Sequence, residues 1–369
     1  MFKRITDMIK KPFSPVELNQ VIFFITSRCN LRCQHCFNWQ NLNTQGELTL
    51  EEIKKISKNT PNFQLLMISG GEPFLREDIV EVVKTFRENN HILGVGIPTN
   101  GTLGDIVIEK TKQLLAIDPK MDVNMYFSID GVGDVHDTIR GVPGTFPKAV
   151  ETLKKLGAIK KDYPNLSIHI NSVISHLSID GLGDLMNYFI DQKIDFINGH
   201  YFEIVRGEPL NNETKDVHTQ KLKTLYARLL DYQNNIWERR GGSWLTRKLN
   251  GALAKANMRF IYQTQYNNFV SKKDWPMPCL AGRSIFALNH NGTVQQCELR
   301  KVIGNIRDYD YDISKMMNTK AYQDELKQIE KDRCFCTHIC FFTESMYKSK
   351  RVVLFELPIA FVKNLLSKF

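Results

Sequence analysis

The sequence has no long uncharged apolar run. Because none of its segments reaches about 18 uncharged apolar residues, we expect no transmembrane helix. The N-terminus lacks the long apolar stretch of a secretory signal, which predicts a cytoplasmic protein. The length of 369 residues predicts one large domain and one small domain, with ordinary soluble composition.

Recognised nucleic-acid-binding motifs are also missing. The formal charge of +9, from 49 basic and 40 acidic residues, favours anionic partners in general. The basic residues are scattered along the chain, without a motif that would gather them on one element. We therefore expect no nucleic-acid partner.

Cysteine is absent from most of the chain and is concentrated at two places. Cys29, Cys33 and Cys36 lie near the N-terminus, and the other five of the eight cysteines lie between Cys279 and Cys340. In a reducing cytosol, such groups are metal ligands or catalytic groups more often than disulfides. The two groups therefore predict two metal sites.

Short apolar strands alternate with helical segments from residue 21 onward. The strand "LLMISGG", for example, is followed by the helical pattern "DIVEVVKTFREN". This alternation predicts a parallel sheet with helices outside it. Six units are too few to close an eight-stranded barrel, so the predicted α/β fold is a partial (β/α)6 TIM-like barrel. Thr49 and Glu52 predict a capping box at the start of the first barrel helix.

The chain is expected to divide into five parts. They are a basic amphipathic segment (1–20), the partial barrel (21–215), a helical bridge (216–276), a small cysteine-rich domain (277–345) and an amphipathic tail (346–369). Within the small domain, "LNHNGTVQQCEL" predicts a hairpin that turns at Asn-Gly. In the barrel, polar corners such as "SGGEP" and "SIDG" end the strands, where parallel barrels place their chemistry.

The spacing of Cys29, Cys33 and Cys36 is compatible with two kinds of metal site. A structural zinc ion needs four ligands, and His35 would be the fourth. A 4Fe–4S cluster held by three thiolates instead leaves one iron open to an external ligand. In "GGEP", two glycines allow close approach, and the carboxylate of Glu72 can receive an ammonium group. An open iron beside an ammonium site would suit an amino acid that chelates the cluster.

Together these features resemble the radical S-adenosylmethionine (SAM) superfamily. The resemblance rests on CxxxCxxC after the first strand, GGEP after the second and six βα units, and it covers nearly the whole chain. It implies that Cys29, Cys33 and Cys36 hold a 4Fe–4S cluster whose fourth iron binds SAM. The implied chemistry is reductive cleavage of SAM to a 5′-deoxyadenosyl radical that abstracts a hydrogen atom from an unactivated carbon. It also implies an electron donor such as flavodoxin or ferredoxin.

The resemblance assigns further cofactor contacts, residue by residue. Gly70, Gly71 and Glu72 would hold the methionyl amine of SAM, and Arg140 would pair with its carboxylate. The other expected contacts are Phe37 near the adenine, Ser128 and Asp130 of "SIDG", and, at two further strand ends, Asn100 and Asn171. Each of these lesser positions could equally be an ordinary turn or strand residue.

The second cysteine group resembles the C-terminal extension called SPASM, or its shorter form, twitch. Cys279 and Cys297 frame the predicted hairpin, and "CFCTHIC" supplies Cys334, Cys336 and Cys340. Five thiols suit one auxiliary 4Fe–4S cluster, for which we predict Cys279, Cys297, Cys336 and Cys340 as ligands. Cys334 could replace Cys336 or be a free thiol. Zinc stays an alternative here, because geometry rather than spacing decides the metal.

An auxiliary cluster could have a redox role or a structural one. As an electron acceptor it would allow net oxidation of the substrate radical. As a structural group it would leave room for epimerisation, with Cys334 as a catalytic thiol that returns a hydrogen atom. We predict oxidation ahead of epimerisation.

The predicted substrate is a small molecule, a sugar or a lipid-linked molecule. Residues 1–20 are too few for the N-terminal peptide-binding domain of many peptide maturases, so maturation of a ribosomal peptide is the alternative. Side chains on the fifth and sixth strands could touch the substrate or be satisfied structural groups. They are His169, His200, Tyr201, Glu203 and Arg206. A non-catalytic metal-binding module is disfavoured, since it would need no ammonium-binding carboxylate at Glu72.

Both terminal segments combine apolar and basic residues. They are "MFKRITDMIKKPF" and "ELPIAFVKNLLSKF". As amphipathic helices they could lie on an anionic membrane, which would make the protein peripheral on its inner face. The other interpretation is that both segments pack on the barrel.

Overall fold

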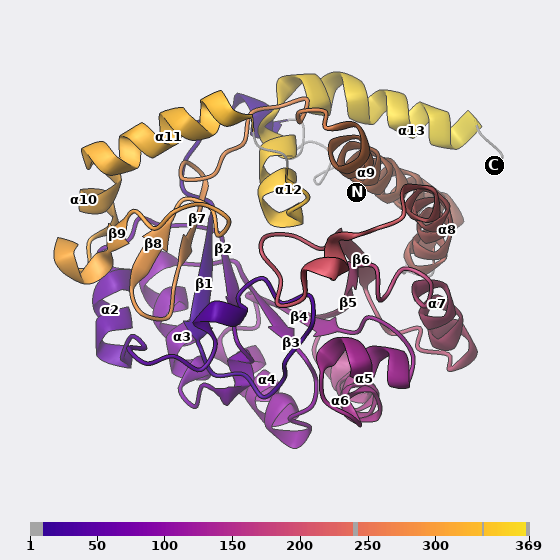
Figure 1. Ribbon diagram of the computed structural model, residues 1–369, viewed down its shortest axis with the longest axis horizontal. Coiled ribbons are helices and arrows are strands. Elements are labelled where there is room, and N and C mark those ends of the chain that lie inside the picture. The colour runs from indigo at the N-terminus through magenta and orange to yellow at the C-terminus, as the bar shows by residue number, and fades with distance from the viewer. Residues whose placement is uncertain (1–9, 239–242, 334–335, 367–369) are drawn as a thin grey trace.

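The computed structural model describes residues 10–238, 243–333 and 336–366 (Figure 1). The predicted N-terminal amphipathic pattern therefore lies mostly outside the described residues. No helix in the described ranges is long and apolar enough to span a membrane.

A parallel six-stranded sheet forms the first part of the chain. Each strand pairs with the next in sequence, in the spatial order β6-β5-β4-β3-β2-β1. The strands are β1 (Gln20–Thr26), β2 (Leu65–Gly70), β3 (Gly94–Thr99), β4 (Asp122–Ser128), β5 (Leu166–Ile174) and β6 (Gly199–Ile204). All seven residues of β1 are buried, as expected for a parallel strand covered on both faces. The predicted partial barrel is confirmed.

Helices connect the strands and cover the outer face of the sheet (Figure 1). They are α2 (Leu50–Lys58), α3 (Ile79–Asn90), α4 (Asp105–Ile117), α5 (Asp134–Arg140), α6 (Thr145–Ile159) and α7 (Leu182–Asp191). The predicted capping box is present at the start of α2, where the side chains of Thr49 and Glu52 bond each other's backbone N–H groups. The buried faces of these helices and strands share one apolar core.

The second part of the chain extends the same sheet. Two long helices, α8 (Thr219–Glu238) and α9 (Trp244–Ser271), pack on each other and lead to β7 (Ile285–Leu288). The strand β7 pairs in parallel with the free edge of β1 and forms a hairpin with β8 (Thr293–Gln295), followed by β9 (Gly304–Asn305). The hairpin turns at Gly292, whose φ of +85° favours glycine. The predicted hairpin is confirmed.

The sheet therefore continues from the barrel into the cysteine-rich part of the chain, while the five-part division of the chain stays a prediction. The edge of β1 would expose unpaired backbone groups, and β7 covers them. Among the described residues no strand joins β6 to β9, so the sheet stays open. The chain then continues through α10 (Ile313–Met317), α11 (Lys320–Asp332), α12 (Ile339–Lys348), a π-helical turn over Val352–Glu356 and α13 (Leu357–Leu366).

Candidate active site

A cavity of about 270 Å³ lies at the C-terminal ends of the parallel strands. Residues from all six strand ends line it, which is the place that the sequence predicted. Both cysteine groups reach it, since Cys29, Cys33 and Cys36 line it together with Cys340. The cavity therefore connects the two regions in which metal sites were expected.

The three thiols of the first group are partly buried. Burial raises the pKa of Cys29 to about 11 and that of Cys36 to about 12. Such thiols stay protonated at neutral pH unless a metal or another cation lies beside them. Arg140 supplies one cation, with its Nη1 3.6 Å from the Sγ of Cys33. Three thiols on one cavity, beside a buried guanidinium, form a donor set that fits a 4Fe–4S cluster.

A close arrangement for one metal ion is not found in the described part of the chain. No group of three His, Cys, Asp or Glu side chains there could hold a single ion. A cluster places its ligands further apart, because each thiolate binds a different iron atom.

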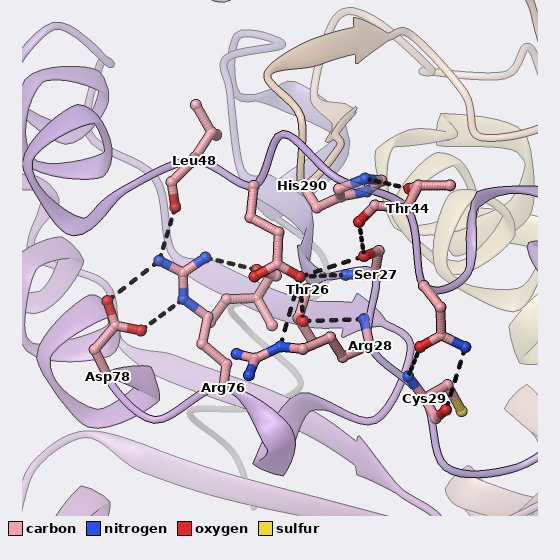
Figure 2. A network of polar contacts seen from close by, with 12 residues as sticks. Thr26, Ser27, Arg28, Cys29, Thr44, Leu48, Arg76, Asp78 and His290 are labelled. Atoms are coloured by element: carbon pink, nitrogen blue, oxygen red, sulfur yellow. Dashed lines mark hydrogen bonds and ion pairs between the residues drawn. The ribbon is translucent and has the colours of Figure 1, made fainter.

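The loop that carries the first cysteines is fastened to the end of β1 (Figure 2). Glu47 accepts hydrogen bonds from the Thr26 hydroxyl at 2.6 Å and from the Ser27 backbone N–H at 2.9 Å. Partial burial alone would raise the pKa of Glu47. The hydrogen bonds outweigh this effect, so the pKa lies below its usual value. Arg76 is buried and donates to the Leu48 carbonyl at 2.9 Å, so both ends of the loop are fixed.

Two side chains fix the middle of this loop. The Asn43 side-chain oxygen accepts from the backbone N–H of Cys29 at 3.0 Å. The Thr44 hydroxyl lies 3.0 Å from the Nε2 of His290, which sits in the β7–β8 turn (Figure 2). The added hairpin therefore supports the cysteine loop directly.

Gly70 and Gly71 line the cavity and also press against the cysteine loop. A Cβ on Gly71 would lie 2.0 Å from the carbonyl oxygen of Arg28, and one on Gly70 would lie 2.3 Å from that of Thr26. The Gly71 N–H donates to Thr26 at 2.9 Å. Close approach thus occurs as predicted, but the observed neighbour is the chain's own backbone. The contact of these glycines with SAM stays a prediction.

Glu72 is 2% exposed and is held by the end of β3. Its carboxylate accepts from the Thr99 hydroxyl at 2.9 Å and from the Asn100 backbone N–H at 2.8 Å. Burial raises its pKa to about 7. A buried carboxylate of this kind gains stability when an ammonium group binds beside it.

Arg140 and Asp130 form a fully buried ion pair. Their Nη2 and Oδ2 atoms lie 2.7 Å apart, and Asp130 also accepts from the Val173 backbone N–H at 2.8 Å. Arg140 lines the cavity, and its Nε has no hydrogen-bond partner among the described residues. Asp130 does not line the cavity, so in this structure it positions Arg140. The direct contact of Asp130 with SAM stays a prediction.

His35, the alternative zinc ligand, is buried beside the same pair. Its Nε2 lies 3.8 Å from the Oδ2 of Asp130. Burial lowers the pKa of His35 to about 4, so the imidazole is neutral at physiological pH.

The other predicted cofactor residues line the same cavity. They are Phe37, Asn100, Ser128 and Asn171. The Phe37 ring lies edge-on to Phe24, with centroids 6.4 Å apart, and 4.7 Å from the Arg206 guanidinium.

The second cysteine group is gathered behind this cavity. Cys279, Cys297 and Cys340 pack in one small apolar cluster. Burial raises the pKa of Cys336 to about 12, and the nearby Cys279 raises it further. Burial and the nearby Cys336 also raise the pKa of Cys297 well above its usual value. The four predicted ligands are thus neighbours, whereas Cys334 lies outside the described residues.

Four charged side chains connect the barrel to this second group. The carboxylate of Glu298 lies 2.8 Å from the Nη2 of Arg206 and 2.8 Å from the Nε2 of His338. Glu203 pairs with the other side of Arg206, and all four residues line the cavity. Sequence reasoning singled out Glu203 and Arg206 but missed Glu298 and His338. Their direct proximity to Cys297, Cys336 and Cys340 in the sequence was the available signal.

The remaining candidates on β5 and β6 do not line the cavity. His200 is fully buried, lies 2.8 Å from the Ser172 hydroxyl and stacks on Phe202. The His169 ring stacks on Tyr126, with centroids 4.9 Å apart. Alternation along β6 explains the position of His200, because it lies an odd number of residues from Glu203 and faces the opposite side. Tyr201 is on the same face as Glu203 but two residues nearer the start of the strand, where its ring lies 5.4 Å from that of His169.

Comparison with known sequences agrees with this geometry. The profile of the Radical SAM superfamily matches residues 23–187, which contain the three cysteines, the GGEP corner and the Asp130–Arg140 pair. Residues 23–187 form a domain of the radical SAM superfamily. Members of this superfamily bind a 4Fe–4S cluster and SAM.

Curated relatives match about half of this chain, and the chain spans about half to two thirds of their own length. A probable GTP 3′,8-cyclase from Methanocaldococcus jannaschii is 28% identical over 54% of the chain and 67% of its own length. A pre-heme d1 synthase from Dinoroseobacter shibae is 29% identical over 57% of the chain and 51% of its own length. An AdoMet-dependent heme synthase from Methanosarcina barkeri is 31% identical, with 49% of each chain covered.

Solved structures share the fold over a longer range. Native anSMEcpe with bound AdoMet has a TM-score of 0.59 at 17% identity, over 93% of this chain and 99% of that chain. SuiB from Streptococcus suis bound to S-adenosylmethionine has a TM-score of 0.57 at 16% identity, over 88% and 71% of the two chains. The likeness therefore includes the part that follows the barrel.

Proposed function

We propose that this radical SAM enzyme cleaves SAM reductively and abstracts a hydrogen atom from a small-molecule, sugar or lipid-linked substrate, with net oxidation. The carrying observation is the single cavity that joins Cys29, Cys33, Cys36, Glu72 and Arg140 to the second cysteine group through Cys340. When bound, the cluster and SAM supply an electron and a 5′-deoxyadenosyl radical. The side chains of the protein would bind and orient these groups.

Cys29, Cys33 and Cys36 would hold the cluster, and Glu72 would receive the methionyl ammonium. Arg140 is suited to the SAM carboxylate, since it is held by Asp130 and keeps its Nε as a donor. Burial of both charged groups strengthens their attraction to a zwitterionic ligand, because less water screens it.

An auxiliary 4Fe–4S cluster on Cys279, Cys297, Cys336 and Cys340 is the second part of the proposal. The proximity of these thiols and the raised pKa values of Cys297 and Cys336 fit a cluster that stabilises thiolates. Such a group beside the substrate cavity could take up the electron that a net oxidation releases. The electron donor to the first cluster would be a flavodoxin or a ferredoxin.

The names of the sequence relatives favour a small substrate. They refer to GTP and to heme compounds. Peptide maturation and epimerisation are the alternatives. The latter would need a hydrogen-atom donor such as Cys334.

Counting iron in designed variants tests the proposal. We would purify and reconstitute the protein without oxygen, then compare it with a Cys29→Ala/Cys33→Ala/Cys36→Ala variant and with a Cys279→Ala/Cys297→Ala/Cys336→Ala/Cys340→Ala variant. We expect about eight irons in the parent and about four in each variant. After reduction in the presence of SAM, the second variant should still release 5′-deoxyadenosine, because its three-cysteine site is intact. The first variant should release none.

Two results would count against the proposal. About four irons in the parent and none in the first variant would remove the auxiliary cluster and, with it, the physical basis for net oxidation. Loss of 5′-deoxyadenosine in the second variant but not in the first would mean that SAM is cleaved at the C-terminal cysteine group and not at the N-terminal one. A Cys334→Ala variant completes the set, since unchanged iron would exclude Cys334 as a ligand.

A further inference from the structure

The outer face of the last two helical segments is apolar. Leu354, Phe355, Ile359 and Val362, which we call the α13 face, are 37%, 63%, 51% and 50% exposed. Phe355, Ile359 and Val362 follow one another at helical spacing, so they lie on one side. On the opposite side α13 packs along α9, and Leu357 is buried (Figure 1). A surface helix normally shows the reverse arrangement, with polar residues toward water.

Basic residues flank the α13 face in the sequence and in the segment that packs beside it. We call Lys10, Lys11, Lys348, Lys350, Arg351 and Lys363 the basic border. The Nζ of Lys348 donates to the Ser14 hydroxyl at 2.8 Å, and the Nζ of Lys350 lies 5.0 Å from the ring centroid of Phe13. These contacts place the exposed Phe13 and the start of the π-helical turn side by side. Across 10–17 and 348–364 there are six basic residues and two acidic ones, and one acid, Glu356, is already paired with Arg351.

We infer that the α13 face and its basic border bind the surface of an anionic lipid membrane. An amphipathic helix of this kind buries its apolar side at the boundary between headgroups and acyl chains, while basic side chains contact anionic headgroups. Exposed phenylalanines on both segments, Phe13 and Phe355, supply the bulky apolar groups that such insertion needs.

Charge favours lipid over a second copy of the chain on the α13 face. Two copies would bring two basic borders together, and like charges oppose such a contact. Anionic headgroups would neutralise the same border. The inference is independent of the proposed reaction, since it uses none of the cavity residues.

The α13 face lies close to the cavity, because the helix α12 connects the two. The helix α12 begins at Ile339, next to the cavity-lining residues His338 and Cys340, and ends at Lys348 in the basic border. Its ten residues span about 15 Å. A bound membrane would thus lie one short helix away from the cavity.

Vesicle sedimentation tests the inference with the full chain. We would compare vesicles of phosphatidylcholine alone with vesicles that also contain phosphatidylglycerol, at low and high salt. We expect sedimentation only with phosphatidylglycerol, and a decrease as salt rises. Phe355→Ser/Ile359→Ser should bind about tenfold more weakly, because two inserted apolar side chains are lost.

A matched control removes two exposed apolar side chains far from the α13 face. Leu93 and Ile106 are 56% and 46% exposed, and Leu93→Ser/Ile106→Ser should bind as the parent does. Thermal unfolding would verify that both variants stay folded. Equal binding of parent and Phe355→Ser/Ile359→Ser, or no binding of the parent, would overturn the inference. So would a dimer in solution that only this variant disrupts, since the face would then belong to a second copy.

Discussion

The guanidinium of Arg206 lies 2.8 Å from the carboxylate of Glu298, and this contact bridges an open sheet. Arg206 follows β6, at one edge of the sheet, whereas Glu298 follows β8 near the other edge. Charged side chains thus connect the two sides where, among the described residues, no backbone pairing does. The bridge also forms a wall of the cavity, so stability and cavity shape depend on the same residues.

Arg206→Met should destabilise the protein strongly. The substitution leaves Glu203 and Glu298 without their shared cation, and breaking a buried pair in this way costs about 3–5 kcal/mol. Urea unfolding of the metal-free protein would measure the change. The matched control is Lys155→Met, which removes exposed pairs with Asp105 and Glu151 and should leave the free energy of unfolding nearly unchanged. Equal losses in the two variants would mean that the bridge contributes no more than a surface pair.

Gly71→Ala should displace the cysteine loop. The added Cβ would meet the Arg28 carbonyl at 2.0 Å, and neither backbone can move without shifting the neighbouring Cys29. We expect loss of most iron from the first site after reconstitution. Gly104→Ala is the control, since its Cβ meets nothing within 4 Å and costs only the strain of a φ of +48°. Normal iron content in Gly71→Ala would show that the loop adapts.

The barrel could be predicted from sequence because each signal was local. The 3.6-residue and two-residue periods, the capping box at Thr49 and the Asn-Gly turn each act within a few residues. The cysteine and GGEP patterns likewise predicted which residues reach one cavity. What could not be predicted depends on distant partners. Pairing of β7 with β1, and of Glu298 with Arg206, joins residues far apart in the chain, for which no local pattern exists.

The role of Asp130 shows the same limit at a single residue. Its place after β4 predicted proximity to the site, and that proximity is present. Whether its carboxylate faces the ligand or Arg140 depends on where α5 places Arg140, ten residues later. The sequence position could not decide this, and the structure pairs the two side chains.

Glu47→Ala should weaken the attachment of the cysteine loop to β1. The Thr26 hydroxyl and the Ser27 N–H would lose their shared acceptor, and unsatisfied buried donors cost about 1–3 kcal/mol. We expect lower stability in urea together with faster loss of iron from the first site to a chelator. Glu51→Ala, on the exposed side of α2, removes a carboxylate that pairs with Lys54 at the surface and should change neither quantity. Unchanged chelation rates in Glu47→Ala would contradict the attachment.

Glu72 should make the stability of the metal-free protein depend on pH. Burial raises its pKa from 4.5 to about 7, so between these values the folded state holds a proton that the unfolded state has released. Stability is therefore lost as pH rises through this window, by about 3 kcal/mol in all for a shift of this size. Below pH 4.5 both states are protonated and the effect vanishes.

Comparison with Glu72→Gln isolates this effect. The amide cannot ionise, and it has one acceptor oxygen where the carboxylate offers one oxygen to Thr99 and the other to Asn100, so one of these hydrogen bonds is lost at every pH. Beyond this constant cost, the free energy of unfolding of the variant should rise relative to that of the parent as pH increases from 4.5 to about 7. A constant difference between the two across that range would show that Glu72 titrates normally. At a saturating concentration of SAM near pH 8, the parent should have the higher free energy of unfolding of the two proteins, because the ammonium group of SAM needs the carboxylate that only the parent has.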